Sequence, residues 1–125
     1  MVVNPLPASR GEAEAVVHEI GTAGGLAIEI AADVAREDQV EAMFAETLDR
    51  FGRLDLLVNN AGIERPSPIR DMTLADWQAV IDVNLTGQFL CSRAAIRAFL
   101  RPNAVERSAA AIGSIVFIGS VHQVI

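Results

Sequence analysis

The stretch Leu54-Asp55-Leu56-Leu57-Val58-Asn59-Asn60-Ala61-Gly62 decides the fold, because a mostly apolar run ends here in two amides and two small residues. A short apolar run of this kind is typical of a strand buried within a parallel sheet. The preceding residues 36–51 carry apolar side chains at helical spacing and stop at Gly52. A helix followed directly by a buried strand indicates parallel pairing, since parallel neighbours need a crossover connection.

The same alternation continues on both sides of this stretch. Besides 54–58, strands are predicted at residues 2–4, 26–30 and 115–118, and each is apolar enough to be covered by helices on both faces. Besides 36–51, helices are predicted at residues 9–22 and from Thr73 to about Arg101. The pattern therefore predicts an α/β fold with a doubly wound parallel sheet.

Two of the predicted helices begin with a capping signal. Ser9 is followed at the right spacing by Glu12, and Thr73 is followed by Asp76. In the first helix an apolar stripe is formed by Val16, Val17 and Ile20. In the long helix, the side that we expect to face the core is formed by Trp77, Val80, Ile81, Asn84, Leu85, Gln88 and Phe89.

The composition fits one domain spanning residues 1–125 and narrows the function classes. A net charge of -6, with ten scattered arginines as the basic residues, disfavours nucleic-acid binding. The lone Cys91 cannot form an internal disulfide, and no signal peptide or membrane span is evident, so we expect a cytoplasmic protein. The sequence contains neither tyrosine nor lysine, so this polypeptide alone cannot run a step that needs a phenol or an ammonium group.

Polar or small residues follow the predicted strands, at the edge where open α/β sheets bind ligands. They are Asn4, Asp33, Asn59 to Gly62, and Gly119-Ser120. From the residues alone, the alternatives stay open: Asp33 could cap a helix, the 59–62 turn could serve only the backbone, and Asn84 could bridge two helices. His18 is expected on the surface, Cys91 in the core, and no metal site is expected around His122.

The segment 56–62 resembles the signature of the short-chain dehydrogenase/reductase family. Asp33-Val34, Val83-Asn84 and Ile118-Gly119-Ser120 are placed relative to it much as in the family, and the resemblance covers residues 2–125. It implies a Rossmann-like sheet in which Asn59 pins the structure while Asn60, Ala61 and Gly62 line the adenosine ribose. It implies that Asp33 binds the adenine amino group, that Asn84 anchors the water of a proton relay, and that Ser120 orients the reacting carbonyl or hydroxyl. The implied cofactor-binding set is completed by Val34, Val83, Ile118 and Arg10.

The family's pattern extends beyond both ends of this chain. A strand with a glycine-rich turn for the pyrophosphate lies before the position of Val2, and a Tyr-x-x-x-Lys pair that carries general acid–base catalysis follows Ser120. We therefore expect a chain truncated at both ends, with an incomplete sheet that also lacks the later strands. Since the first strand sits mid-sheet in the doubly wound order, unpaired edges and apolar faces should be exposed, which makes the isolated chain marginal or aggregation-prone.

The expected function is that of a fragment of an NAD(P)-dependent oxidoreductase, which moves a hydride between nicotinamide and a small alcohol or carbonyl substrate. Segments 62–66, 84–87 and 120–125 are similar to bacterial glucose 1-dehydrogenases, which implies a sugar such as glucose, although oxoacyl reductases share much of this frame. Asn4 at the end of the second family strand, with Arg10 after it, favours NADP or dual use over NAD alone. The parent enzyme is expected to be a homo-oligomer. The alternative is an inactive protein that binds a nucleotide or a partner.

Overall fold

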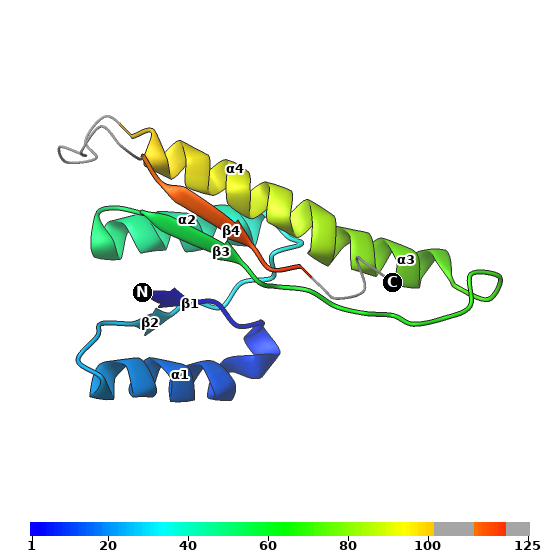
Figure 1. Cartoon of the computed structure of the whole chain (residues 1–125), viewed down its shortest axis with the longest axis horizontal. Coiled ribbons are helices and arrows are strands. Elements are labelled where there is room, and N and C mark those ends of the chain that lie inside the picture. Colours follow the sequence, from blue (N-terminus) through cyan, green and yellow to red (C-terminus); the bar gives the residue numbers. More distant parts are fainter. Residues whose placement is uncertain (102–111, 120–125) are drawn as a thin grey trace.

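The computed structural model describes residues 1–101 and 112–119, except for the side chains of Ala8 and Arg10. Helices and strands alternate along the chain, as predicted (Figure 1). Their order is β1 (Val2–Val3), α1 (Arg10–Thr22), β2 (Ile28–Glu29), α2 (Glu37–Phe51), β3 (Leu56–Asn59), α3 (Leu74–Ile81), α4 (Gln88–Phe99) and β4 (Ser114–Phe117). A 3-10 turn, Pro7–Ser9, precedes α1, and a π-helical turn, Asp82–Gly87, joins α3 to α4. The result is a Rossmann-like α/β fold.

The strands form two separate parallel sheets of two strands each, β1–β2 and β3–β4. Val3 pairs with Glu29 in the first sheet, and Leu57 pairs with Ile115 in the second. Among the described residues no strand joins the two sheets. The parallel pairing is therefore confirmed, and so is the expected break in the middle of the sheet.

Helices lie on opposite sides of the first sheet. Figure 1 shows α1 on one side of β1–β2 and α2 on the other. Val2 and Ile28 pack against the core cluster that contains Val40 and Phe44 of α2, whereas the buried Ala13 of α1 is not part of that cluster. Because crossovers between parallel strands are right-handed, a helix on each face means that the chain moves outward from β1 to β2 and then returns past β1 to reach β3. Thus β1, not β2, is the strand turned toward β3.

One apolar cluster underlies both sheets and joins them to α2 and α4. Its members from α2 are Val40, Met43 and Phe44, those from α4 are Leu90, Cys91, Ala94, Ala95 and Phe99, and Leu57 and Ile115 of the second sheet pack against it. The helical spacing of apolar residues predicted within 36–51 is confirmed, because the buried residues of α2 are Val40, Met43, Phe44 and Thr47. Gly52 ends α2 with φ of 73°, a left-handed conformation that glycine adopts without strain.

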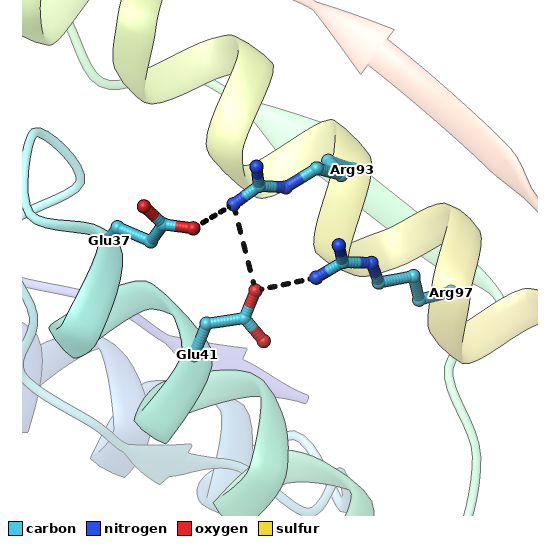
Figure 2. Close-up of polar contacts among 4 residues, drawn as sticks. All are labelled: Glu37, Glu41, Arg93 and Arg97. Carbon is cyan, nitrogen blue, oxygen red and sulfur yellow. Dashed lines mark hydrogen bonds and ion pairs between the residues drawn. The ribbon is translucent and has the colours of Figure 1, made fainter.

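Ion pairs add a polar seam between α2 and α4 (Figure 2). Arg93 pairs with Glu37 and lies 3.8 Å from Glu41, while Arg97 binds Glu41 at 2.9 Å. The guanidinium of Arg93 also stacks 5.2 Å from the ring centroid of Phe89. These side chains connect the exposed sides of the two helices, where such pairs contribute about 0–1 kcal/mol each.

The predicted core-facing side of the long helix is wrong at Trp77, Leu85 and Phe89. Leu85 and Phe89 are 63% and 58% exposed, and Trp77 is 51% exposed. The buried positions are instead Gly87, Leu90, Cys91, Ala94, Ala95, Ala98 and Phe99. The π-helical turn explains the change after Asn84, because its extra residue rotates every later position by about 100° relative to a continuous α-helix; the exposure of Trp77, which precedes the turn, is not explained by it.

Several local predictions also need correction. Thr73 caps α3 as expected, accepting a hydrogen bond from the Asp76 amide at 3.1 Å, but Ser9 makes no such bond at the start of α1. Val16 is 42% exposed, so Ala13 takes its place on the buried side of α1. The strand predicted at 26–30 is only two residues long, and those predicted at 54–58 and 115–118 lie at 56–59 and 114–117.

The strands of the second sheet are not covered on both faces. Leu56, Val58 and Val116 are 52%, 49% and 41% exposed, whereas Leu57 and Ile115 pack inward. The exposed apolar face agrees with the expectation for an incomplete sheet. In the described part of the chain, no helix combines the length and apolar character needed to cross a membrane.

Candidate functional site

The loop after β3 is tied to the π-helical turn by the side chain of Asn84. The Ile63 amide donates to Asn84 Oδ1 at 2.8 Å, and Asn84 Nδ2 donates to the Ile63 carbonyl at 3.0 Å. Asn84 is only partly buried, so both bonds stand close to solvent. The structure therefore assigns this side chain a definite local task, which is to hold the backbone just after the 59–62 turn.

The turn that carries Asn84 departs from α-helical geometry over Asp82–Gly87. A π-helical turn costs regular hydrogen bonding and is frequent at functional sites. Here the turn lies between the Thr73-capped α3 and the buried α4, which hold it from both ends. It positions Val83 and Asn84 toward the end of β3.

Close packing at Gly87 brings the loop after β2 onto the same turn. A Cβ atom at Gly87 would lie 2.8 Å from Val34 Cγ2 and 3.3 Å from the Val34 carbonyl oxygen. Only glycine permits this approach, so Gly87 sets the distance between the 33–35 loop and the helix. Val34 and Val83 thereby line one common surface.

Asp33 forms hydrogen bonds only with nearby residues of its own loop and of α2, among the bonds of the described residues. Its Oδ1 accepts from the Ala35 amide at 3.0 Å, and its own amide donates to Gln39 Oε1 at 2.8 Å. These bonds fix the loop that leads into α2, but Asp33 does not cap this helix, because its N-cap residue is Arg36, whose side chain makes no capping hydrogen bond. They leave Oδ2 without a hydrogen bond among the described contacts of this side chain.

Asn59 is buried and connects β3 to α4, since its Nδ2 donates to Ser92 Oγ at 3.1 Å. Its carbonyl accepts from the Ile118 amide at 3.0 Å, which extends the pairing with β4 to the end of both strands. Asn60, Ala61 and Gly62 follow directly and are exposed. The two strand ends thus present small or polar residues together at one edge.

A small depression lies where these parts meet. It is lined by Val34, Asn59, Ala61, Val83, Gly87, Gln88 and Cys91. Burial raises the pKa of the Cys91 thiol to about 11, so the thiol is neutral near pH 7 and acts as an apolar group in this wall. The surface is mostly apolar, and Asn59 and Ala61 are the residues of the 59–62 turn that line it.

Not every predicted site residue joins this group. Asn4 instead ties β1 to β2, because its Nδ2 donates to the carbonyls of Ile30 and Ala32 at 3.0 and 3.1 Å. Arg10 begins α1, at the end of the first sheet, and nothing is described of its side chain. Ser120 and His122 lie outside the described residues. Among the residues that are described, no cluster of three His, Cys, Asp or Glu side chains could hold a metal ion.

The site also contains residues that were not predicted from the sequence, namely Ile63, Gly87, Gln88 and Cys91. Ile63 takes part only through its backbone, which no side-chain pattern reveals. Gly87 had a signal, since an isolated glycine inside a helical pattern often marks a close packing contact. The structure brings together Val34, Asn59 to Gly62, Val83 and Ile118, with Asn84 beside them.

Comparison with known proteins gives matches along nearly the whole chain. The family described as "short chain dehydrogenase" matches residues 2–124. A 3-oxoacyl-[acyl-carrier-protein] reductase of Synechocystis sp. is 50% identical over 101 residues, which are 81% of this chain and 40% of that protein. The chain therefore spans about two fifths of the length of this curated relative.

Solved structures share the fold. A short chain dehydrogenase from Burkholderia cenocepacia J2315, in complex with NADP, is 37% identical with a TM-score of 0.72 and matches 78% of this chain and 39% of its own. A gluconate 5-dehydrogenase from the same organism, in complex with NADP and tartrate, is 35% identical with a TM-score of 0.70 and matches 78% and 38%.

Proposed function

Because the chain belongs to the short chain dehydrogenase family, we propose that it carries the adenosine side of the cofactor site of an NADP- or NAD-dependent oxidoreductase. The observation that carries the proposal is the pair of hydrogen bonds between Asn84 and Ile63. They lock the exposed 60–62 backbone beside Val34 and Val83, where a flat apolar group could lie against small residues.

The residues present fit such a ligand. Asn60, Ala61 and Gly62 are exposed and carry small side chains or a polar amide, so a ribose could approach their backbone closely. Val34 offers an apolar contact for an adenine face, and Asp33 Oδ2 is available to accept from the adenine amino group. Ile118, 51% exposed, would cover the continuation of the site beyond β4.

When bound, the nicotinamide supplies the acceptor or donor of a hydride. Asn84 has a positioning role in this proposal, because both polar atoms of its side chain are already bonded to Ile63. Ser120 would orient the reacting carbonyl or hydroxyl by a hydrogen bond. The family's pattern assigns general acid–base transfer to a Tyr-x-x-x-Lys pair, and this sequence contains neither tyrosine nor lysine.

Cofactor binding is tested directly on the 125-residue chain. Titration with NADPH, followed by NADPH fluorescence and by NMR, should shift the amides of Val34, Ala61 and Gly62 first. Gly62→Ala should weaken binding by about tenfold by adding a methyl group at the closest approach, whereas Gly21→Ala on α1 should not change it. Equal affinity of both variants would contradict the proposed site.

The preference for NADP over NAD is proposed to depend on Arg10. Adenosine 2′,5′-bisphosphate should bind more tightly than adenosine 5′-monophosphate, because only the former carries the 2′-phosphate that an arginine can pair with. Arg10→Gln should remove that difference and leave the affinity for the monophosphate unchanged. A difference that persists in Arg10→Gln would assign the selectivity to another residue.

Two substrate classes remain candidates for the complete enzyme. The 50% identity to the Synechocystis reductase supports a 3-oxoacyl thioester, and the similarity of segments 62–66 and 84–87 to glucose 1-dehydrogenases supports a sugar. A chimera of the Synechocystis reductase, with its 101 matched residues replaced by those of this chain, can be assayed with acetoacetyl-CoA and with glucose. Reduction of acetoacetyl-CoA without glucose oxidation would support the thioester, and the reverse result would support the sugar.

A second candidate function is nucleotide or partner binding without catalysis. The absence of tyrosine and lysine from the sequence favours it for the chain on its own. On this candidate function the chain should bind NADPH and show no turnover at any pH from about 6 to about 9. This range covers the pH values at which general acid–base catalysis usually operates. Turnover by the chain alone would reject this second candidate.

A further inference from the structure

The loop between β2 and α2 is held by three hydrogen bonds at Asp33. The Asp33 amide donates to Gln39 Oε1 at 2.8 Å, and its carbonyl accepts from the Arg36 amide at 3.0 Å. The side-chain Oδ1 accepts from the Ala35 amide at 3.0 Å. Two of these bonds come from backbone amides, so the bond to Gln39 is the one that depends on a side chain of α2.

Gln39 stands on a well-anchored part of the fold. The next residue of α2, Val40, is 1% exposed and belongs to the core cluster, while Gln39 itself is partly buried. On the other side of the loop, the close approach at Gly87 holds Val34 against the long helix. The loop is therefore held between two helices that share one core, and the Gln39 side chain makes the contact from α2.

The bond from Gln39 serves the loop and not the helix. Gln39 lies in the first turn of α2, which begins at Glu37, yet its Oε1 accepts from the amide of Asp33, four residues before that start. Loss of the bond should free the Asp33 backbone and leave α2 in place. In Gln39→Ala the helix is favoured further, because alanine has the higher helix propensity.

We propose that Gln39 is a positioning residue for the adenine end of the cofactor site, because it holds Asp33 where the free Oδ2 can accept from the adenine amino group. This role rests on the proposed function and adds to it a residue that does not touch the ligand. The aspartate side chain is short, so a shift of its backbone displaces Oδ2 as well. Hydrogen bonds weaken steeply once their angle and distance depart from the best values.

Two nucleotides that differ only at the amino group test the proposal on the 125-residue chain. Adenosine 5′-monophosphate carries that group, and purine riboside 5′-monophosphate carries hydrogen in its place. Calorimetry should show about tenfold tighter binding of the adenosine nucleotide, because it alone can donate to Asp33. In Gln39→Ala this ratio should fall to about threefold or less, with little change for the purine riboside nucleotide. A general loss of stability would weaken both nucleotides alike and leave the ratio unchanged.

Matched variants separate the hydrogen bond from other effects of the substitution. Gln39→Glu keeps an oxygen that can accept from the Asp33 amide, and its charge lies at the positive end of α2, so the tenfold ratio should persist. Gln39→Asn is too short to reach the amide and should resemble Gln39→Ala, which gives a second test if the alanine variant does not fold. Asp38→Asn changes the adjacent exposed residue, which pairs with Arg36 at 3.4 Å, and should leave the ratio unchanged.

Amide hydrogen exchange measures the same bond without any nucleotide. The Asp33 amide should exchange about tenfold faster in Gln39→Ala than in the unaltered chain, because it has lost its acceptor. In Gln39→Glu the exchange should stay slow. The Val40 amide, which donates to the Arg36 carbonyl within the first turn of α2, should change little in either variant.

The possible outcomes distinguish this role from the proposed function. A nucleotide ratio that is unchanged in Gln39→Ala, although the Asp33 amide exchanges faster, would overturn the role of Gln39 and leave the cofactor site standing. Equal affinity of the unaltered chain for the two nucleotides would overturn the contact between Asp33 and the amino group, and with it the role of Gln39. No binding of either nucleotide or of NADPH would overturn the proposed function itself. A ratio that falls in Gln39→Ala and Gln39→Asn but persists in Gln39→Glu would establish the positioning role.

Discussion

Asn84 and Ile63 form a reciprocal pair in which one side-chain amide satisfies both the amide and the carbonyl of one backbone residue. The pair joins the loop after β3 to the π-helical turn, two segments that are 21 residues apart in the sequence. No other described side chain of the site makes two bonds of this kind to a single backbone residue. The conformation of the 60–62 turn therefore depends on the π-helical turn that carries Asn84 as well as on the loop itself.

Asn84→Ala should destabilise the fold by about 1–3 kcal/mol, because it leaves two partly buried backbone groups of Ile63 without partners. Asn84→Asp should keep the bond from the Ile63 amide and lose the bond to its carbonyl, which gives a smaller loss. Gln78→Ala is the matched control, since Gln78 bonds only Asp82 on an exposed helix surface and should cost no more than about 0.5 kcal/mol. Urea denaturation measures all three, and equal losses for Asn84→Ala and Gln78→Ala would contradict the structural role of the pair.

Gly87→Ala should destabilise the chain by about 1–3 kcal/mol, because the new methyl group would lie 2.8 Å from Val34 Cγ2. Gly21→Ala is the control: its Cβ would meet nothing within 4 Å, so the better helix propensity of alanine should stabilise α1 by up to about 1 kcal/mol. Opposite shifts in urea midpoint are the expected pattern. The double variant Gly87→Ala with Val34→Ala should recover part of the loss, and no recovery would mean that the strain arises elsewhere.

Glu41→Gln should lower stability by up to about 1 kcal/mol at low salt, because Glu41 faces both Arg93 and Arg97 in the seam shown in Figure 2. Salt screens such exposed pairs, so the difference from the unaltered chain should shrink at high ionic strength. Glu46→Gln, which breaks only the local pair with Arg50 at 3.5 Å, is the control with a smaller effect. A loss that is independent of salt would indicate packing and not charge.

The Cys91 thiol should make the chain less stable as the pH rises from 9 to 11. Burial raises the pKa of the folded thiol from 9.0 to about 11. Between these two pH values the thiol of the unfolded chain loses its proton while the folded thiol keeps it, so the free energy of unfolding falls as the pH rises. Below pH 9 the contribution of the thiol is fully present. Since the sequence has no lysine or tyrosine, few other groups titrate there.

Cys91→Ala provides the control for this pH dependence. The variant should lose some packing at all pH values but show no decline between pH 9 and pH 11 that is due to a thiol. Iodoacetamide should label Cys91 slowly in the folded chain and rapidly after denaturation. A decline with pH that is unchanged in Cys91→Ala would assign it to another group.

Leu56→Thr combined with Val116→Thr should raise the solubility of the isolated chain. Both side chains lie on the uncovered face of the second sheet, at 52% and 41% exposure, and threonine keeps the strand preference while removing apolar surface. Light scattering at increasing concentration measures the effect. Leu57→Thr, on the inward face, should instead unfold the chain, and a sharp melt of soluble unaltered monomer would show that the exposed face is tolerated.

The periodicity of α2 and the capping signal at Thr73 predicted those elements correctly because local sequence determines both. The buried face of the long helix could not be predicted from 3.6-residue spacing, since the π-helical turn changes the phase between Asn84 and Leu90. Ser9 did not form its expected cap, because the 3-10 turn before α1 gives it a different backbone conformation. Short strands such as β2 depend on pairing with β1, which is decided by contacts far apart in the sequence.

Part of the candidate site could likewise be predicted from the sequence, and part could not. The strand-end rule placed Asp33 and the 59–62 turn near one edge, and the structure brings Val34, which follows Asp33, together with Asn59 and Ala61. It could not foresee that Asn84 would bind a backbone residue, or that Gly87 would let Val34 approach. Both contacts depend on how the long helix packs against two loops that are distant in the sequence. Asn4 also lies at a strand end, but its side chain joins β1 to β2 and does not reach the site.

The π-helical turn has an evolutionary consequence. Deletion of one residue between Asp82 and Gly87 would turn the segment into an ordinary α-helix and rotate α4 by about 100°. Phe89 would then turn toward the sheets, the alanines that now meet α2 would turn to solvent, and the ion pairs across the seam would lose their register. A single deletion would remove the support of the 60–62 turn and the packing of the core together, so natural selection for a stable fold would preserve the irregular turn even in a descendant that no longer needed the site.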